Sequence, residues 1–507
     1  MSAGALVRRT ARGSTALRGG RVRRLTPYQV FGLLFWLLMT LAYWRVPPCC
    51  EAGQHAAAVE RLRAGLVDGA VSPYVLAQGA LARLTGLTGW QLLRVCGPVD
   101  LLMLLTGLGR LVRVLTPRPW APVLALTFMA VLWGTEPALG GGSLALLPLT
   151  GSLGYPSAFA LGLTFWAWAL TGARARDLRR VRYVGPSGLR SLSGYAALGA
   201  LYGVVALIDP VTGVGAGTGA VAFAAGWQRG WRGAVWGRWG LMCAVAAGVV
   251  VCGTHARVLP LSSYGAYGAY VPHGLYNGVV GQCWLALLGV PALWLRARRA
   301  AGRASWRTAR RASWPTAGRA SRRAVWLAAW RDPLVLLFAL ECLIAGYGHG
   351  FGEVLGLALL APQCALAVEL AAERPWPGWR RALGWAAAGG ACLGFLTAQA
   401  GAVVPRSVDP VGFAQPPRWP SYDWAARHIG PGEPVVTDAY YAVRLLPGYG
   451  IELADGHDHR PRVRWLLLTR RERLPEKAVV VDWSRRTGEV LARLTRTREA
   501  SGATTRR

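Results

Sequence analysis

Charged side chains are scarce in this chain, and their scarcity excludes the commonest class of protein. Only 16% of the 507 residues are Asp, Glu, Lys or Arg, whereas 53% are hydrophobic and the mean hydropathy is +0.30. Soluble globular domains carry about a quarter charged residues. The composition therefore excludes an ordinary soluble protein of this length.

Acidic residues and lysine are scarcer still. Asp and Glu total 24 against 57 Lys and Arg, which gives a net charge of +33, and Lys477 is the only lysine. With a single lysine, the bias toward Arg and Ala reflects a GC-rich genome more than function. The sequence also lacks Walker, Rossmann and HExxH patterns, so it carries no signal for nucleotide-driven chemistry.

The apolar residues that dominate the chain fall in long runs. Many runs approach the roughly 20 residues that a helix needs to cross a bilayer. Arginines gather in the short segments between them, and seven arginines from Arg8 to Arg24 precede the first run, Tyr28–Trp44. Positive charge of this kind marks the cytoplasmic segments of membrane proteins. The pattern indicates a polytopic membrane protein surrounded by lipids, and it argues against a nucleic-acid partner.

This alternation predicts an all-α membrane protein of about eleven transmembrane helices. Residues 1–27 form a basic cytoplasmic amino terminus, and residues 28–403 form the transmembrane domain, with a first extracytoplasmic loop at 45–96. An odd number of spans places the carboxyl terminus outside. There, residues 404–495 predict a small α/β domain, and residues 496–507, rich in Arg and Thr, predict a disordered tail.

Within that domain, three stretches carry the prediction. SYDWAARHIG is typical of a short helix, whereas EPVVTDAY and KAVVVDW are typical of buried strands. The tripeptide at 430–432 and Pro447-Gly448 indicate turns.

The first outside loop carries an acid and a histidine four residues apart, in CCEAGQHAAAVERL. If a helix from Leu62 onward lies on the membrane surface, Glu51 and His55 sit one turn apart near its start and face the same way. A carboxylate so placed could take a proton from an acceptor hydroxyl. The alternative is that Glu51 only favours a helix amino terminus and His55 is a surface residue.

Cysteines lie at both ends of the same loop. Cys96 could form a disulfide with Cys49 or Cys50, because the outer side of the membrane is oxidising.

Acids near the expected span ends have structural explanations. Asp209 precedes Pro210 at an outer turn, where we expect it to cap the following helix. Asp100 lies close to the start of an expected span at Gly97–Leu115, and Glu136 follows another span, so both are expected to reach lipid headgroups.

Other acids are harder to place. Glu341 lies deeper in an apolar run, and with His349 and Glu353 it would suit the proton or ion pathway of a transporter. Asp455–His459 (DGHDH) has the residue types of a metal site, but its ligands are too close in sequence to complete a tetrahedral shell alone. We therefore expect a solvated loop there, and neither a metal site nor a cofactor.

Several stretches together resemble the GT-C glycosyltransferases, membrane enzymes with many spans and an outside carboxyl-terminal domain. The resemblance rests on EAGQHAAAVERL and SPYVLAQGALARLTGLTGWQLL, on YPS and DPVT at 155–157 and 209–212, and on SYDWAARHIGPGEPVVTD and LLPGYGIELADGHDHRPRV. In a group of these enzymes an acid and a His precede an SPY-like element. One departure is that the family's acid is usually Asp, often beside a second acid, whereas this chain has the single Glu51.

The resemblance implies transfer of a sugar from a polyprenyl-phosphate donor to an acceptor hydroxyl at the outer membrane face. The acceptor would be a cell-envelope glycan, lipid or protein. Glu51 would be the base, with His55 beside it and Tyr74 of the SPY element among the substrate-binding residues. Two alternatives stay open: a transporter or flippase of lipid-linked substrates, and a catalytically inactive scaffold of the same fold.

A second outside loop, at 255–277, would then serve the donor. The leaving lipid phosphate needs cations or hydrogen-bond donors, and the tyrosines would offer flat faces for stacking on sugars. The candidates are His255, Arg257, Tyr264, Tyr267, Tyr270, His273 and Tyr276. The alternative is an aromatic belt at the membrane interface.

Overall fold

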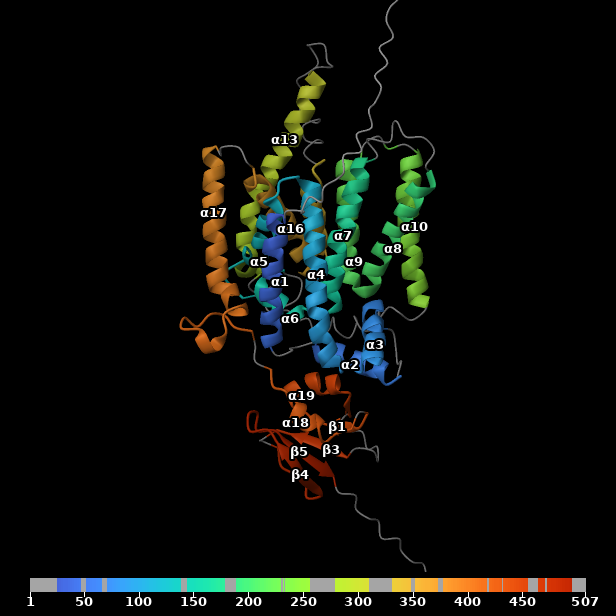
Figure 1. Cartoon of the computed structure of the whole chain (residues 1–507), viewed down its shortest axis with the longest axis vertical. Coiled ribbons are helices and arrows are strands. Elements are labelled where there is room, and N and C mark those ends of the chain that lie inside the picture. Colours follow the sequence, from blue (N-terminus) through green and yellow to red (C-terminus); the bar gives the residue numbers. More distant parts are fainter. Residues whose placement is uncertain are drawn as a thin grey trace, which may run out of the picture.

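The computed structural model has two parts, a large helical bundle and a small domain that contains a sheet (Figure 1). The domain lies at one end of the bundle, which we call the domain end; the opposite end is the far end. The structure describes residues 25–46, 52–65, 71–137, 144–177, 188–228, 231, 233–255, 279–309, 331–347, 352–372, 377–416, 419–430, 432–454, 464–469 and 472–494.

The bundle consists of long helices and a short one of 11 residues, Ala121–Val131, and they run side by side in Figure 1. They are α1 (Pro27–Arg45), α4 (Gly89–Leu115), α5 (Ala121–Val131), α7 (Pro156–Asp177), α8 (Gly188–Ile208), α9 (Pro210–Trp227), α10 (Gly233–His255), α13 (Val290–Ala309), α15 (Pro333–Tyr347), α16 (Gly352–Leu370) and α17 (Gly378–Gly394).

Shorter helices occupy the ends and connections. They are α2 (Ala52–Arg63), α3 (Pro73–Thr85) and α6 (Leu146–Ser152) at the domain end, α12 (Val279–Cys283) and η3 (Trp284–Gly289) before α13, and η4 (Phe395–Gln399), η5 (Ala400–Ala402) and η6 (Arg406–Val408) after α17. Together α2 and α3 place a helical layer between the bundle and the C-terminal domain (Figure 1).

Part of the bundle is long and apolar enough to cross a membrane. Four described helices meet this condition: Pro27–Arg45, Gly89–Leu115, Gly233–His255 and Val280–Arg299. Four shorter apolar helices are Ala121–Val131, Leu192–Ile208, Pro333–Gly346 and Leu355–Leu370. The expected total of about eleven spans therefore stays a prediction.

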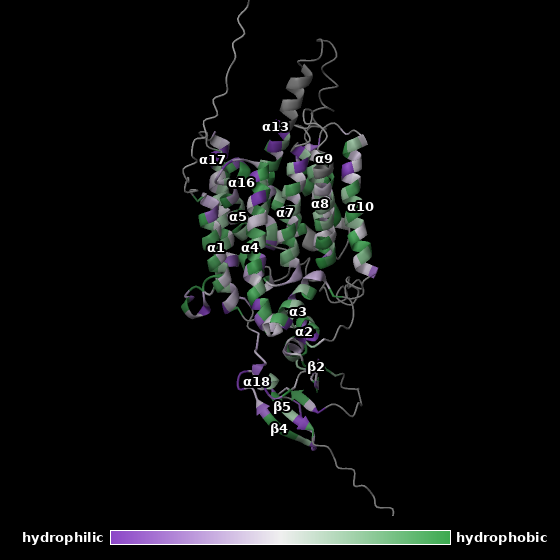
Figure 2. Ribbon diagram, turned by 45° about the vertical axis from the view of Figure 1, so that its right-hand side comes forward, coloured by the Kyte–Doolittle hydropathy of each residue, from purple (hydrophilic) through white to green (hydrophobic). Residues whose placement is uncertain are grey.

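The outer surface of the bundle suits lipid rather than water. On α1, large apolar side chains are exposed: Leu33, Leu34, Leu37, Leu38 and Leu41. Figure 2 shows hydrophobic colouring along the outer helices. Apolar area left in water is unfavourable by about 25 cal/mol per Å², so such a surface is stable only in an apolar solvent. The bundle is that of a membrane protein.

Helix α4 begins earlier than expected, and this changes the position of Asp100. Thr88 and Gln91 form a capping box that starts the helix at Gly89 rather than near Gly97. Asp100 therefore lies inside the helix, with 1% of its surface exposed. The expectation that Asp100 reaches headgroups is wrong.

Asp209 has the structural role predicted for it. It is the N-cap of α9, and its Oδ2 accepts a hydrogen bond from the backbone N–H of Thr212 at 3.2 Å. Pro210 occupies the first helical position, where its missing N–H has no intrahelical partner to lose. The capping prediction is confirmed.

The C-terminal domain is built on a five-stranded sheet of order β2-β1-β3-β5-β4. The strands are β1 (Pro434–Val436), β2 (Glu452–Leu453), β3 (Trp465–Leu468), β4 (Ala478–Trp483) and β5 (Val490–Leu494). β1 runs parallel to β2 and β3, whereas β5 pairs antiparallel with β3 and β4. The helices of the domain are α18 (Asp423–Ala426), α19 (Tyr440–Leu445) and η7 (Leu446–Tyr449).

The predicted elements of this domain are largely present. The short helix is α18, and the two predicted strands are β1 and β4. β4 is not buried as expected, because it is the edge strand and Val479 is 56% exposed. Pro447-Gly448, expected as a turn, belongs to the 3₁₀ helix η7.

Candidate functional site

A cleft opens at the domain end, where the first helices of the chain meet. Its empty space amounts to about 400 Å³, a volume that includes open solvent. Its walls come from the end of α1, the starts of α2 and α4, and the segment around α6. The lining residues are Tyr43, Val46, Ala52, Trp90, Leu93, Arg94, Thr150, Gly151, Leu153 and Tyr155.

Hydrogen bonds between α1 and α4 fix one wall of the cleft. The Tyr43 hydroxyl donates to the Leu93 carbonyl at 2.9 Å, and Trp44 Nε1 donates to the Arg94 carbonyl at 3.0 Å. These bonds place Arg94, an exposed cation, at the cleft where two candidate membrane spans come together.

His55 stands close to the cleft on α2. The helix covers Ala52–Arg63, so the expectation that it begins at Leu62 is wrong. The His55 ring lies 4.8 Å from the ring of Tyr155, a cleft residue. Burial disfavours the charged imidazolium and lowers the pKa of His55 to about 4. His55 is therefore neutral at physiological pH.

The C-terminal domain holds α2 from the other side. A Cβ on Gly53 would lie 1.8 Å from the carbonyl oxygen of Arg444, so only glycine permits this approach. A second close contact brings Gly448 of η7 against the Trp90 ring, which also packs on Tyr449 with centroids 5.6 Å apart. One wall of the cleft is thus supported by the domain.

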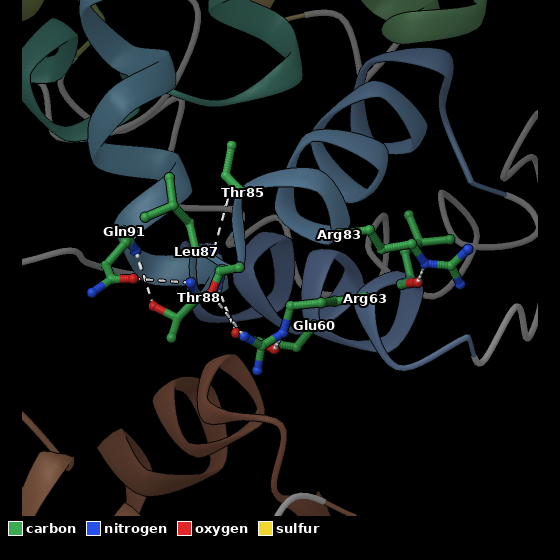
Figure 3. A network of polar contacts seen from close by, with 10 residues as sticks. Glu60, Arg63, Arg83, Thr85, Leu87, Thr88 and Gln91 are labelled. Atoms are coloured by element: carbon green, nitrogen blue, oxygen red, sulfur yellow. Dashed lines mark hydrogen bonds and ion pairs between the residues drawn. The ribbon is translucent and has the colours of Figure 1, made fainter.

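A polar network ties α2 to α3 and α4 (Figure 3). Glu60 is buried, and its carboxylate accepts the Gly89 N–H at 2.6 Å and pairs with Arg63 Nε at 2.8 Å. Arg83 of α3 donates to the Leu62 carbonyl at 2.6 Å. These charge-assisted bonds fix the orientation of α2, and with it the position of His55.

Tyr74 of the SPY element points into the protein. Ser72 caps α3 and Pro73 is its first residue. The Tyr74 hydroxyl then donates to Asp100 Oδ2 at 2.6 Å and lies 3.3 Å from the Gly154 carbonyl oxygen. Burial, followed by the Asp100 charge, raises the pKa of Tyr74 far above its usual range. Its substrate-binding role stays a prediction, and its hydroxyl has a partner within the protein.

Most other predicted site residues lie outside the described residues. These are Glu51, Arg257, Tyr264, Tyr267, Tyr270, His273 and Tyr276, together with Cys49 and Cys50 of the predicted disulfide. His255 ends α10, where its Nδ1 is 3.0 Å from the Val251 carbonyl oxygen. The structure thus places His55 beside the cleft, against Tyr155, whereas residues 256–277 of the second loop lie outside the described residues.

Sequence reasoning missed Arg94 and Trp90, and it missed the position of Tyr155 at the cleft against His55. Trp90 and Arg94 lie in a largely apolar stretch that contains no recognisable motif. The sequence indicates only a turn at Tyr155. All three residues line the cleft. Because the cleft forms only when helices distant in the sequence pack together, no local sequence signal marks these residues.

The described residues contain no group of three or more His, Cys, Asp or Glu side chains that could hold a metal ion. The Asp455–His459 stretch lies outside them.

Comparisons with known proteins identify the fold. No family model matches the sequence, and no curated protein does. The arabinofuranosyltransferase AftD from Mycobacteria is similar in structure, with a TM-score of 0.50 and 13% identity, over 93% of this chain and 40% of that one. ArnT from Cupriavidus metallidurans, solved with undecaprenyl phosphate, has a TM-score of 0.45 and 15% identity over 92% and 97% of the two chains.

A third similar structure is the oligosaccharyltransferase from Archaeoglobus fulgidus, solved with Zn and sulfate. Its TM-score is 0.46 and its identity 12%, over 86% of this chain and 68% of that one. All three proteins are GT-C glycosyltransferases. The match to AftD shows that this chain has the GT-C fold, as the resemblance of its sequence implied.

Proposed function

We propose that this protein is a membrane glycosyltransferase that moves a sugar from a polyprenyl-phosphate donor to an acceptor hydroxyl on the extracytoplasmic side. The observation that carries the proposal is the cleft at the domain end. Two candidate membrane spans, α1 and α4, line it together with α2 and the segment around α6. A lipid-linked donor from the bilayer and an acceptor from outside could meet only at such a boundary.

Arg94 is the donor-phosphate ligand in this proposal. Arginine offers a fork of N–H donors that matches phosphate oxygens. Arg94 lines the cleft at the level where α1 ends, the depth at which the phosphate of a membrane-embedded lipid would lie. Its charge would stabilise the lipid phosphate as it leaves.

Glu51 is the proposed base. In the sequence it lies between two residues that line the cleft, Val46 and the directly following Ala52. His55 is one turn along α2 from Ala52 and neutral, so it can orient the acceptor hydroxyl by hydrogen bonding without forming an ion pair with Glu51.

The reaction then balances as a substitution at the anomeric carbon. The carboxylate of Glu51 takes the acceptor's hydroxyl proton, and the oxygen forms a bond to the anomeric carbon. The bond between that carbon and the phosphate oxygen breaks, and its electron pair leaves with the polyprenyl phosphate. General-base help of this kind is worth about 10²–10⁴-fold in rate.

Glu51→Gln tests the proposal, because it keeps the size of the side chain and removes the proton acceptor. Transfer from a polyprenyl-phosphate donor pool in membranes should fall about 10²–10⁴-fold at equal protein level. Glu136→Gln, which alters an exposed carboxyl outside the cleft, is the matched control and should leave transfer unchanged. Undiminished transfer by Glu51→Gln would remove Glu51 from the mechanism.

The proposed orientation has a separate test. With the amino terminus in the cytoplasm and the domain outside, a reporter fused after residue 404 should be active only if it works outside the cytoplasm. Activity of a cytoplasm-only reporter at that site would reverse the topology, and with it the side on which transfer occurs.

A transporter or flippase of lipid-linked substrates is the second candidate, and Glu341 favours it. Its side chain is 0% exposed in α15, and neither carboxylate oxygen has a hydrogen-bond partner among the described residues. Intramembrane carboxyls often carry protons in transporters. Loss of lipid translocation in Glu341→Gln, with no sugar transfer by the wild type, would favour this function.

A further inference from the structure

The C-terminal domain carries an aromatic surface that the proposed reaction at the cleft does not use. Tyr440 and Tyr441 begin α19 and are 60% and 40% exposed. Their rings pack edge to face with centroids 5.3 Å apart, and Trp419 lies behind both, at 6.4 Å and 5.2 Å. We call Trp419, Tyr440 and Tyr441 the aromatic platform.

Arg444 packs against one ring of the platform, that of Tyr440. Its Nη1 donates to the Tyr440 hydroxyl at 2.6 Å, and its guanidinium carbon lies 4.2 Å from the centre of the same ring. A guanidinium carries five N–H donors, so this bond leaves others for a ligand. The platform is therefore a set of mutually packed rings beside a cation, an arrangement that can bind a ligand.

The platform is adjacent to the cleft. The carbonyl oxygen of Arg444 forms the tight contact with Gly53 of α2, and the preceding residue, Ala52, lines the cleft. In Figure 1, α19 lies on the face of the domain that is turned toward the bundle, and α2 stands between them. A molecule lying on the platform would thus extend toward the reacting groups from the side away from the lipid.

We propose that the aromatic platform binds the acceptor, and that the acceptor is a carbohydrate chain. This inference rests on the proposed sugar transfer at the cleft. Sugar rings present flat C–H faces that stack on tyrosine, while their hydroxyl groups accept from guanidinium N–H groups and exchange hydrogen bonds with phenols. Glycans match the platform because it combines exposed ring faces with the N–H donors of Arg444.

The test measures glycan binding by the full-length protein in nanodiscs of phosphatidylcholine. The probe is an array of neutral oligosaccharides of hexose or pentose units. The wild type should bind part of the array, and Tyr440→Ala with Tyr441→Ala should bind at least tenfold more weakly, since one stacked ring is worth about that much. Tyr440→Phe, which keeps the ring, should lose far less.

Val443→Ser is the matched control, because Val443 is exposed on the same helix and is not aromatic. It should bind like the wild type. No binding by the wild type to any glycan overturns the proposal, and so does equal binding by the double alanine variant. If the rings instead contact lipid headgroups, no glycan binds, and the double alanine variant changes the thermal midpoint in nanodiscs but not in detergent. This outcome also overturns the proposal.

The same variants separate this inference from the proposed function. Glu51→Gln should bind glycans like the wild type, because Glu51 does not belong to the platform, while its transfer falls. If the wild type transfers sugar and the double alanine variant keeps the acceptor KM, the proposal that the platform binds the acceptor is wrong, while the proposed transferase function is supported. If glycans bind through the platform but no sugar is transferred, the proposed function is wrong, while the assignment of the platform as a glycan-binding surface is supported.

Discussion

Gly53→Ala should separate the C-terminal domain from α2, and the structure gives the size of the effect. The new Cβ would lie 1.8 Å from the Arg444 carbonyl oxygen, whereas ordinary van der Waals contact begins at 3.4 Å. To restore ordinary contact, the two backbones must therefore move apart by about 1.6 Å, the difference between these two distances. Overpacking of this kind destabilises a contact by about 1–3 kcal/mol.

The sign of the effect makes this prediction specific. In an exposed helix, Gly→Ala stabilises by about 1 kcal/mol through helix propensity, so a loss of stability at Gly53 must come from the clash. Gly217→Ala is the control, because a Cβ at Gly217 in α9 would have no atom within 4 Å. It should be neutral or slightly stabilising.

Two measurements follow the displacement. Hydrogen exchange in α2 should accelerate in Gly53→Ala and not in Gly217→Ala, because α2 loses its support from the domain. If the proposed transfer takes place at the cleft, its rate should fall by up to about 10²-fold, the usual effect of misplacing reacting groups by 1 Å. Unchanged exchange in α2 would show that the domain does not hold this helix, and the positioning argument would be refuted.

Three further changes test the site and the bundle. The pKa of His55 is about 4 in the folded protein and 6.5 in its usual range, so the unfolded chain takes up a proton first as the pH falls. The free energy of unfolding should therefore decline as the pH falls from 6.5 to about 4. A His55→Gln variant whose thermal midpoint follows the same pH curve as the wild type would contradict this. Tyr74→Phe should destabilise by about 1–3 kcal/mol, because the buried Asp100 loses its hydroxyl partner; a double-mutant cycle with Asp100→Asn should give a coupling clearly different from zero. Asp209→Ala should cost about 1 kcal/mol through loss of the α9 cap, and Asp209→Asn much less; equal thermal midpoints for both variants would exclude capping.

Local features of the fold could be predicted, because neighbours in sequence cause them. Long apolar runs between arginines gave membrane helices, and an Asp before a Pro gave the cap of α9. The same logic located α18 and the strands β1 and β4. It failed for the burial of β4, since a Val-rich strand has the same sequence whether it lies in the middle of a sheet or, as here, at its edge.

The start of α4 shows how a small local signal can be overlooked. The capping box of Thr88 and Gln91 was present in the sequence, but the apolar pattern suggested a later start at Gly97. That shift placed Asp100 at a helix end instead of in the interior, where it binds Tyr74. An error of two turns thus changed the predicted environment of an acidic residue.

The sequence by itself determined that this is a membrane protein of helices with a small α/β domain, and its motifs indicated the GT-C fold. These properties depend on hydrophobicity, charge and short turn signals, which act between residues a few positions apart. Only the tertiary structure decided that Arg94 and Tyr155 line one cleft with His55 packed against Tyr155, and that Gly53 meets Arg444, which lies far away in the sequence. Such contacts arise from the packing of helices and domains, because complementary surfaces distant in sequence leave no local pattern to read.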